Sequence, residues 1–226
     1  MVGLALKFEC QSLADVMASV YPTGTPIETV YLVDDNVDIR RHLFDVLQHL
    51  GYRVEVFGEA SEFLRLPSVS FPAVLLLDMR MPGLSGLDVQ QSDLVAQHAL
   101  PIIFMSGESQ NQEIISAMKA GAIDFLWKPF SVDVLSAAVA HGMQRARVQG
   151  VLMHRRTQLL ASYKTLSNRE KEVFVYLLKG YSNKALAHRL SLLPDTIKKY
   201  RAHIFEKMGV TDLPSLIQRC EGVSFD

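Results

Sequence analysis

The stretch that most constrains the fold of this chain is residues 71–86, FPAVLLLDMRMPGLSG. Five apolar residues, Ala73 to Leu77, run without a polar interruption into Asp78 and a Met-Pro-Gly turn. An apolar run of this length without alternation predicts a central strand of a parallel sheet that is covered on both faces. Asp78 is then expected at the carboxyl end of the strand, where open α/β sheets bind their ligands.

Strand and helix signals alternate along residues 28–145. Short β-branched or apolar runs predict five strands, at residues 29–33, 54–57, 73–77, 102–105 and 125–127. Amphipathic stretches between them predict helices, at residues 36–50, 61–66, 85–98 and 110–120. Strands that alternate with helices form parallel sheets through right-handed crossovers. We therefore expect an α/β domain with a doubly wound, five-stranded parallel sheet.

The formal net charge of −1 conceals an uneven distribution along the chain. Residues 28–130 hold 14 acidic and 7 basic side chains, whereas residues 162–226 hold 7 acidic and 11 basic ones. An acidic front half and a basic back half indicate two domains with different partners. The basic half is the better candidate for binding a polyanion.

A long helix is predicted to begin at Ser131, because no proline follows before Pro194. Spacings of three and four residues along it are typical of a coiled-coil seam, made here of Met143, Ala146, Gly150, Met153, Thr157 and Leu160. The same residues are compatible with a helix that packs on its own domain and continues as a linker over residues 146–164. The sequence leaves both interpretations open.

After this linker the helix signals become short. Ser167 and Glu170 form a capping box for a first helix, and Ser182 can cap a second. A tight turn leads to a third helix at Pro194, and Asp212 can cap a fourth. Four short helices, two of them joined by a tight turn, predict an all-α helix-turn-helix domain over residues 165–226. Residues 1–27 remain unassigned, as an N-terminal extension.

The sequence also indicates where the protein resides. No apolar run reaches the roughly 20 residues that a membrane-spanning helix needs. The first residues lack the basic segment and long apolar run of a secretion signal. Cys10 and Cys220 are interpreted as free thiols in a reducing compartment. We expect a cytoplasmic protein with no membrane partner.

Five charged or hydroxyl-bearing residues stand at strand ends in the first domain: Asp34, Asp35, Asp78, Ser106 and Lys128. The carboxyl ends of parallel strands share one edge, so these side chains can converge. Crowded carboxylates are tolerable around a divalent cation, and an all-oxygen site with open positions favours Mg²⁺. With Lys128 available to neutralise a phosphoryl oxygen, the set describes Asp78 as a phosphoryl acceptor.

Residues 28 to about 145 resemble a bacterial response-regulator receiver domain, which has a flavodoxin-like or CheY-like fold. The resemblance rests on the pair Asp34-Asp35 and on the stretches 77–83 (LDMRMPG), 105–107 (MSG) and 125–130 (FLWKPF). It implies that a partner histidine kinase phosphorylates Asp78. It also implies that Mg²⁺ is held by Asp34, Asp35, Asp78 and the backbone carbonyl of Arg80.

The same resemblance implies a conformational switch. Ser106 and Phe125 would rearrange on phosphorylation, and Lys128 would meet the phosphoryl group. The bond between Lys128 and Pro129 would be cis. The surface formed by the fourth helix, fifth strand and fifth helix would then change and favour a homodimer.

Residues 165–220 resemble the DNA-binding domain of the NarL/FixJ (LuxR-type) regulators, through the stretches 166–173 (LSNREKEV), 180–184 (GYSNK), 196–198 (TIK) and 207–210 (KMGV). The third helix of this domain corresponds to the recognition helix, whose N-terminal part enters the major groove. The resemblance places Lys198 and Lys199 at base edges. Contacts with phosphates or with the turn fall to Thr196, Arg201, Asn183 and Lys184.

Two positions depart from that family. Leu193 replaces the serine that usually caps the recognition helix, a loss that typically costs about 1 kcal/mol. Asp195 could cap the helix instead. Ala202 stands where some relatives carry a basic contact residue. Both departures predict weaker DNA binding without a change of fold.

The sequence thus predicts a two-component transcription regulator and not an enzyme. A histidine kinase would phosphorylate Asp78, which would favour dimerisation and binding to double-stranded DNA, with RNA polymerase as a further partner. A phosphatase or phosphotransferase is an alternative, but Arg80 stands where such an enzyme commonly has a second aspartate as its general acid–base. A regulator held as a constitutive dimer by its linker is another.

Overall fold

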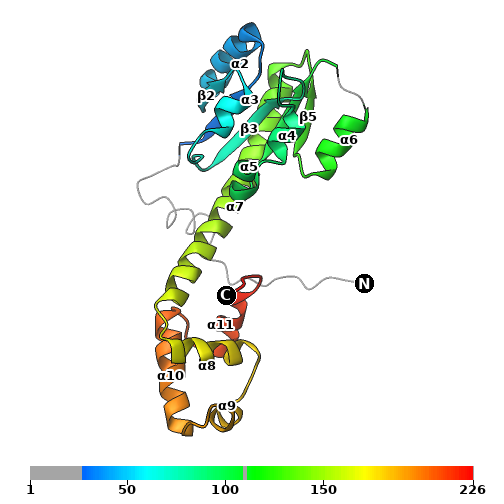
Figure 1. Cartoon of the computed structure of the whole chain (residues 1–226). Helices are drawn as coiled ribbons and strands as arrows, with labels where there is room; N and C mark the ends of the chain where they lie inside the picture. Colours follow the sequence, from blue (N-terminus) through cyan, green and yellow to red (C-terminus); the bar gives the residue numbers. More distant parts are fainter. Residues whose placement is uncertain (1–26, 109–110, 226) are drawn as a thin grey trace, which may run out of the picture. The chain divides into compact units, whose positions relative to one another are not determined.

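The computed structural model describes residues 27–108 and 111–225. The chain divides into two compact units, and the division falls between Val151 and Leu152. Figure 1 shows the helices and strands of each unit. Residues 1–26 lie outside the described part, and so do the expectations for the N-terminal extension and for Cys10.

Unit 1 is built on a five-stranded sheet in which all neighbouring strands are parallel, in the order β2-β1-β3-β4-β5. The strands are β1 (Thr29–Val33), β2 (Arg53–Phe57), β3 (Ala73–Asp78), β4 (Ile102–Ser106) and β5 (Asp124–Trp127). The central strand β3 lies between β1 and β4, and all six of its residues are buried. This confirms the predicted parallel sheet.

Helices cover both faces of this sheet (Figure 1). Successive strand residues point to opposite faces. Tyr31 and Leu75 contribute to one apolar cluster, whereas Val30 and Val74 contribute to another. The first cluster is covered by α3 (Ala60–Leu64), α4 (Gly86–Gln90), α5 (Asp93–His98) and α6 (Asn111–Lys119). The second is covered by α2 (Val37–His49) and the beginning of α7 (Val132–Lys164).

The single helix predicted for residues 85–98 is two helices, α4 and α5, in the structure. Ser92 separates them with an extended backbone conformation. Its hydroxyl donates a hydrogen bond to the carbonyl of Val89 at 2.6 Å and accepts one from the N–H of Val95 at 3.4 Å. A serine that bonds to its own backbone in this way ends one helix and caps the next.

The long helix α7 runs for 33 residues. Met143 and Ala146 are buried in the core of unit 1. Gly142 lies so close to β3 that an added Cβ would stand 3.0 Å from a methyl group of Val74. Two of the proposed seam positions therefore pack within unit 1, whereas Met153, further along, is 40% exposed. This favours the interpretation that α7 packs on its own domain and continues as a linker.

Unit 2 holds the end of α7 and four short helices around one apolar core. The helices are α8 (Asn168–Leu178), α9 (Asn183–Leu190), α10 (Pro194–Lys207) and α11 (Leu213–Cys220). Ser191, with φ of +53°, ends α9 in a left-handed conformation and begins the tight turn into α10. The four helices and the tight turn agree with the predicted helix-turn-helix domain.

Within the described residues, no helix combines the length and the apolar character that crossing a membrane requires. Cys220 is a buried, free cysteine in the core of unit 2. Burial raises the pKa of its thiol to about 11. This thiol is therefore protonated and unreactive at neutral pH.

Candidate metal centre and nucleic-acid interface

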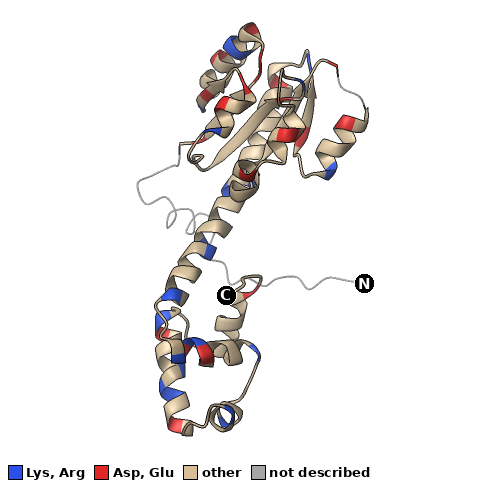
Figure 2. Cartoon of the chain, viewed as in Figure 1, with Lys and Arg blue, Asp and Glu red and all other residues tan. Residues whose placement is uncertain are grey.

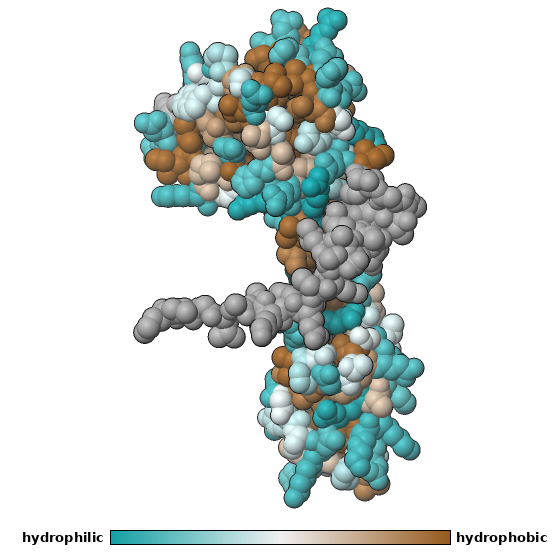
Figure 3. Space-filling view, turned by 180° about the vertical axis from the view of Figure 1, so that it is seen from behind, coloured by the Kyte–Doolittle hydropathy of each residue, from teal (hydrophilic) through white to brown (hydrophobic). Residues whose placement is uncertain are grey.

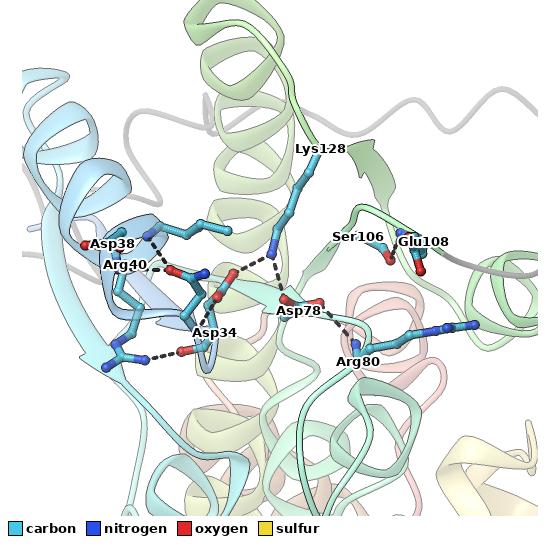
Figure 4. Close-up of polar contacts among 10 residues, drawn as sticks. Asp34, Asp38, Arg40, Asp78, Arg80, Ser106, Glu108 and Lys128 are labelled. Carbon is cyan, nitrogen blue, oxygen red and sulfur yellow. Dashed lines mark hydrogen bonds and ion pairs between the residues drawn. The ribbon is translucent and has the colours of Figure 1, made fainter.

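Three carboxylates meet at the carboxyl edge of the sheet in unit 1 (Figure 4). Asp34 and Asp35 follow β1, and Asp78 ends β3. One oxygen from each carboxylate lies within 4.8 Å of the other two. Asp34 and Asp78 are buried, whereas Asp35 is exposed. Oxygen ligands that converge beside an open surface suit a hard divalent cation such as Mg²⁺.

Lys128, which follows β5, joins two of these carboxylates. Its Nζ donates to Oδ2 of Asp34 and to Oδ2 of Asp78, in both cases at 2.6 Å (Figure 4). Burial opposes the charge of Lys128, but the hydrogen bonds to the two aspartates outweigh burial and raise its pKa. Burial raises the pKa of Asp78, and hydrogen bonds from Lys128 and from the Arg80 N–H offset this only in part.

The loop after β3 folds back onto the end of the strand. Oδ1 of Asp78 accepts the N–H of Arg80 at 3.0 Å, and the carbonyl of Met79 accepts the N–H of Gly86 at 3.0 Å. A Cβ at Gly86 would lie 2.6 Å from the carbonyl oxygen of Asp78 and 2.8 Å from the ring of Phe104. Only glycine fits this close approach. Gly86 was not predicted as part of the site, although a glycine directly after the helix cap Ser85 is a sequence signal for such a close approach.

The two residues assigned to the switch lie on neighbouring strands. Ser106 ends β4 and is 2% exposed, and its Oγ accepts the N–H of Glu108 at 3.2 Å. Phe125 of β5 is half-buried, and its ring meets that of Trp127 edge-on at 5.1 Å between centroids. Figure 4 places Ser106 on the same edge as Asp78 and Lys128. The Lys128–Pro129 bond is cis, as the resemblance implied.

In unit 2, several Lys and Arg residues are spread along α10, where Figure 2 colours the ribbon blue. Ile197 and Ile204 are fully buried and fix which side of the helix faces the core. Lys198 and Lys199 are consequently exposed. The ammonium of Lys198 lies 3.0 Å from a carboxylate oxygen of Asp195. Both side chains are open to solvent, so the ion pair is weak and Lys198 can leave Asp195 to bind a phosphate.

The other residues assigned to DNA contact differ in their surroundings. Lys184 is exposed on α9, and Thr196 is half-buried in the first turn of α10. Arg201 donates a hydrogen bond to Oδ1 of Asn183 at 2.7 Å, which ties α10 to the first turn of α9. These two residues therefore have a structural partner in the protein as well as a possible one in DNA.

The start of α10 has no side-chain cap. Leu193 occupies the N-cap position, is 74% exposed and makes no capping hydrogen bond. The carboxylate of Asp195 bonds to Lys198. Asp195, raised above as an alternative cap, does not cap the helix, because it lies inside the first turn and its carboxylate bonds to Lys198.

The other end of α10 is held firmly. Glu170, 4% exposed in α8, accepts hydrogen bonds from Lys207 of α10 at 2.7 Å and from the N–H of Ser167 at 2.7 Å. Lys207 also donates to the carbonyl of Thr165 at 3.3 Å. This buried carboxylate joins α8 to the end of the predicted recognition helix.

Comparison with known proteins agrees with both units. Residues 30–140 match the family described as "Response regulator receiver domain", and residues 164–220 match "Bacterial regulatory proteins, luxR family". The chain is 36% identical over 192 residues to the response regulator protein TodT of Pseudomonas putida, covering 85% of each chain. It is 35% identical over 190 residues to the transcriptional regulatory protein FixJ of Bradyrhizobium diazoefficiens, covering 84% of this chain and 92% of that one.

Solved structures of two response regulators are similar over most of the chain. StyR matches with a TM-score of 0.72 and 34% identity, covering 87% of this chain and 99% of that one. Full-length FixJ from B. japonicum matches with a TM-score of 0.53 and 34% identity, covering 87% and 97%.

The sheet, its acidic edge and the helix-turn-helix unit define a two-component response regulator. The chain belongs to the NarL/FixJ family of these regulators, whose DNA-binding domain is of the LuxR type. It is a phosphorylation-controlled transcription regulator and not an enzyme, which excludes the phosphatase alternative. Its two domains imply a histidine kinase and DNA as partners.

Proposed function

We propose that Asp78 accepts the phosphoryl group and that Asp34, Asp35, Asp78 and the backbone carbonyl of Arg80 hold Mg²⁺. The observation that carries this proposal is the position of Lys128, whose ammonium lies 2.6 Å from both Asp34 and Asp78. The ammonium of Lys128 thus partly balances the charge of three carboxylates whose oxygens lie within 4.8 Å of one another. Such a site is suited to a divalent cation and to an incoming anionic phosphoryl group.

In the proposed reaction, a carboxylate oxygen of Asp78 attacks the phosphorus of a phosphohistidine on the kinase. The new P–O bond forms as the P–N bond breaks, and the imidazole leaves with its electron pair. Mg²⁺ held by these residues would supply positive charge for the phosphoryl oxygens. Lys128 then turns its hydrogen bond from Asp78 to a phosphoryl oxygen, while the Arg80 N–H keeps the aspartyl group in place.

Phosphorylation adds about two negative charges and three acceptor oxygens at Asp78. The Ser106 hydroxyl lies at the same edge of the sheet and would turn toward them. The half-buried ring of Phe125 can then move into the space that Ser106 leaves. Because Phe125 contacts Trp127 through the ring edge, this movement would change the exposed surface of β5.

That surface already carries apolar side chains that a partner could cover. Five residues of α6, β5 and the start of α7 are between 43% and 53% exposed: Ile115, Met118, Trp127, Val132 and Val134. Figure 3 shows hydrophobic surface on this unit among hydrophilic residues. Exposed apolar patches of this kind support protein–protein association. We propose that phosphorylation favours a homodimer through this surface.

A dimer would place two α10 helices on paired half-sites in double-stranded DNA. Lys198 and Lys199 are exposed and suited to reading base edges, whereas Thr196, Arg201, Asn183 and Lys184 are suited to phosphate or turn contacts. RNA polymerase would be a further partner at the promoter.

Size measurement with a phosphoryl mimic tests the proposal. The full chain should shift from monomer to dimer when beryllofluoride and Mg²⁺ are added, and Asp78→Asn protein should stay monomeric. If wild-type and Asp78→Asn protein were both dimers, with and without beryllofluoride and Mg²⁺, the result would instead support a constitutive dimer held by α7. A shift that persists in the Asp78→Asn variant would exclude Asp78 as the acceptor.

A further inference from the structure

Arg40 of α2 reaches back over the loop that carries the acidic pair. Its Nη1 donates a hydrogen bond to the backbone carbonyl of Asp34 at 2.6 Å. Figure 4 shows the guanidinium on the opposite side of Asp34 from Lys128. The guanidinium also lies face-on to Gly58, since an added Cβ there would stand 3.4 Å from its carbon and from both terminal nitrogens.

Every polar group of Asp34 is fixed by the protein. Oδ1 accepts the N–H of Asn36 at 2.9 Å, and Oδ2 accepts from Lys128 at 2.6 Å. The backbone N–H donates to the carbonyl of Phe57 at 3.3 Å, and the backbone carbonyl accepts from Arg40. Lys128 bonds to the carboxylate, whereas Arg40 bonds to the backbone of the acidic loop.

We propose that Arg40 is a positioning residue for the metal centre. It holds the backbone between β1 and α2 in the conformation in which Asp34 and Asp35 converge with Asp78. This inference rests on the proposed Mg²⁺ site. Groups that orient metal ligands without touching the metal typically change affinity by about 10- to 100-fold when they are removed.

The positive charge of Arg40, taken by itself, should weaken Mg²⁺ binding, whereas its positioning role should strengthen it. A guanidinium near three carboxylates repels an incoming cation, so its removal by itself would strengthen Mg²⁺ binding. If Arg40 acts by positioning, its removal should weaken Mg²⁺ binding. If it acts mainly through its charge, its removal should strengthen Mg²⁺ binding. The sign of the change in affinity shows which role Arg40 has.

Isothermal titration calorimetry of the full chain with Mg²⁺ measures whether the substitution weakens or strengthens Mg²⁺ binding. Arg40→Gln should bind Mg²⁺ roughly 10-fold more weakly than wild type. Arg41→Gln, which removes the same charge from the adjacent, exposed position, should bind about as tightly as wild type or slightly more tightly. Phosphorylation of Arg40→Gln by a small phosphodonor should be slow at limiting Mg²⁺ and should recover at saturating Mg²⁺, which a damaged fold would not do.

Binding by Arg40→Gln that is as tight as wild type, or tighter, would overturn the inference. If circular dichroism shows that Arg40→Gln does not fold, Arg40→Lys is measured in its place. Lysine keeps the positive charge but lacks the planar guanidinium group. Arg40→Lys should bind more weakly than wild type, and equal binding would overturn the inference. Failure of the wild-type chain to bind Mg²⁺ would instead overturn the metal site itself, and the role of Arg40 with it.

Discussion

Arg80 and Glu113 form an ion pair that joins the loop after the proposed acceptor to helix α6, with Nη2 of the arginine 3.2 Å from Oε2 of the glutamate. Arg80 stands two residues after Asp78, and α6 carries Ile115 and Met118 of the proposed dimer surface. A phosphoryl group on Asp78 would compete with Glu113 for the guanidinium. This ion pair therefore links the loop beside Asp78 to the helix that carries part of the proposed dimer surface.

A double-mutant cycle with Arg80→Gln and Glu113→Gln measures the strength of this pair. Both side chains are partly exposed, so we expect a coupling of about 0.2–1 kcal/mol in urea unfolding followed by the single tryptophan, Trp127. With beryllofluoride and Mg²⁺ present, the coupling should shrink, because Arg80 then has a second anion nearby. A coupling that grows under these conditions would show that the pair belongs to the activated state instead.

Gly86→Ala should destabilise unit 1, because its Cβ would lie 2.6 Å from the backbone oxygen of Asp78. We expect a loss of about 1–3 kcal/mol in urea unfolding, as for other overpacked positions. Gly107→Ala is the matched control, since its Cβ would have no neighbour closer than 4.0 Å. Equal stabilities of the two variants would contradict the close approach at Gly86.

Glu170→Gln should loosen α8 and α10 in a pH-dependent manner. Burial acts to raise the pKa of Glu170, but hydrogen bonds from Lys207 and Ser167 outweigh it and hold the pKa below its usual value. A carboxyl whose pKa is depressed by folding stabilises the fold above its unfolded pKa, about 4.3, and this stabilisation is lost as the pH falls through the folded pKa.

Hydrogen exchange of amides in α8 and α10 measures this effect within unit 2. At pH 7 the Glu170→Gln variant should lose about 1.5–3 kcal/mol of protection, and the difference from wild type should narrow below a pH of about 4. Glu172→Gln, which removes a more exposed carboxylate paired with Arg169, should lose less than about 1 kcal/mol. If the difference in protection between Glu170→Gln and wild type did not change over this pH range, the lowered pKa of Glu170 in the folded protein would be contradicted.

Leu193→Ser should stabilise the start of α10 by about 1 kcal/mol, because serine supplies the missing cap. Leu193→Ala removes the same exposed apolar side chain without supplying a cap and serves as the control. Hydrogen exchange in the first turn of α10 should slow in the serine variant alone. Equal protection in the two variants would show that the start of α10 does not depend on a cap.

The sequence predicted the sheet well because its signals are local and strong. The buried run before Asp78 is continuous, and the rule that parallel strands end at one edge brought together Asp34, Asp78 and Lys128 without coordinates. The break at Ser92 was missed because a serine hydroxyl bonding to its own backbone overrides a helical pattern.

Other features depend on distances between side chains that no sequence pattern encodes. Arg40 looks like an ordinary solvated residue of an amphipathic helix, and its contact with the Asp34 carbonyl depends on how α2 leaves β1. The pairing of Arg80 with Glu113 joins residues 33 positions apart in sequence. The roles of Lys198 and Lys199 in reading bases stay predictions, which a DNA complex would test.

The most direct test of the account is the mass of the intact protein after incubation with a small phosphodonor. With Mg²⁺ present, the wild-type chain should gain one phosphoryl group, and so should Asp45→Asn, which alters an exposed carboxylate of α2. Without Mg²⁺ the wild-type chain should gain almost none. Asp78→Asn should gain none under either condition. A full phosphoryl gain by Asp78→Asn, or by the wild-type chain without a divalent cation, would contradict the account.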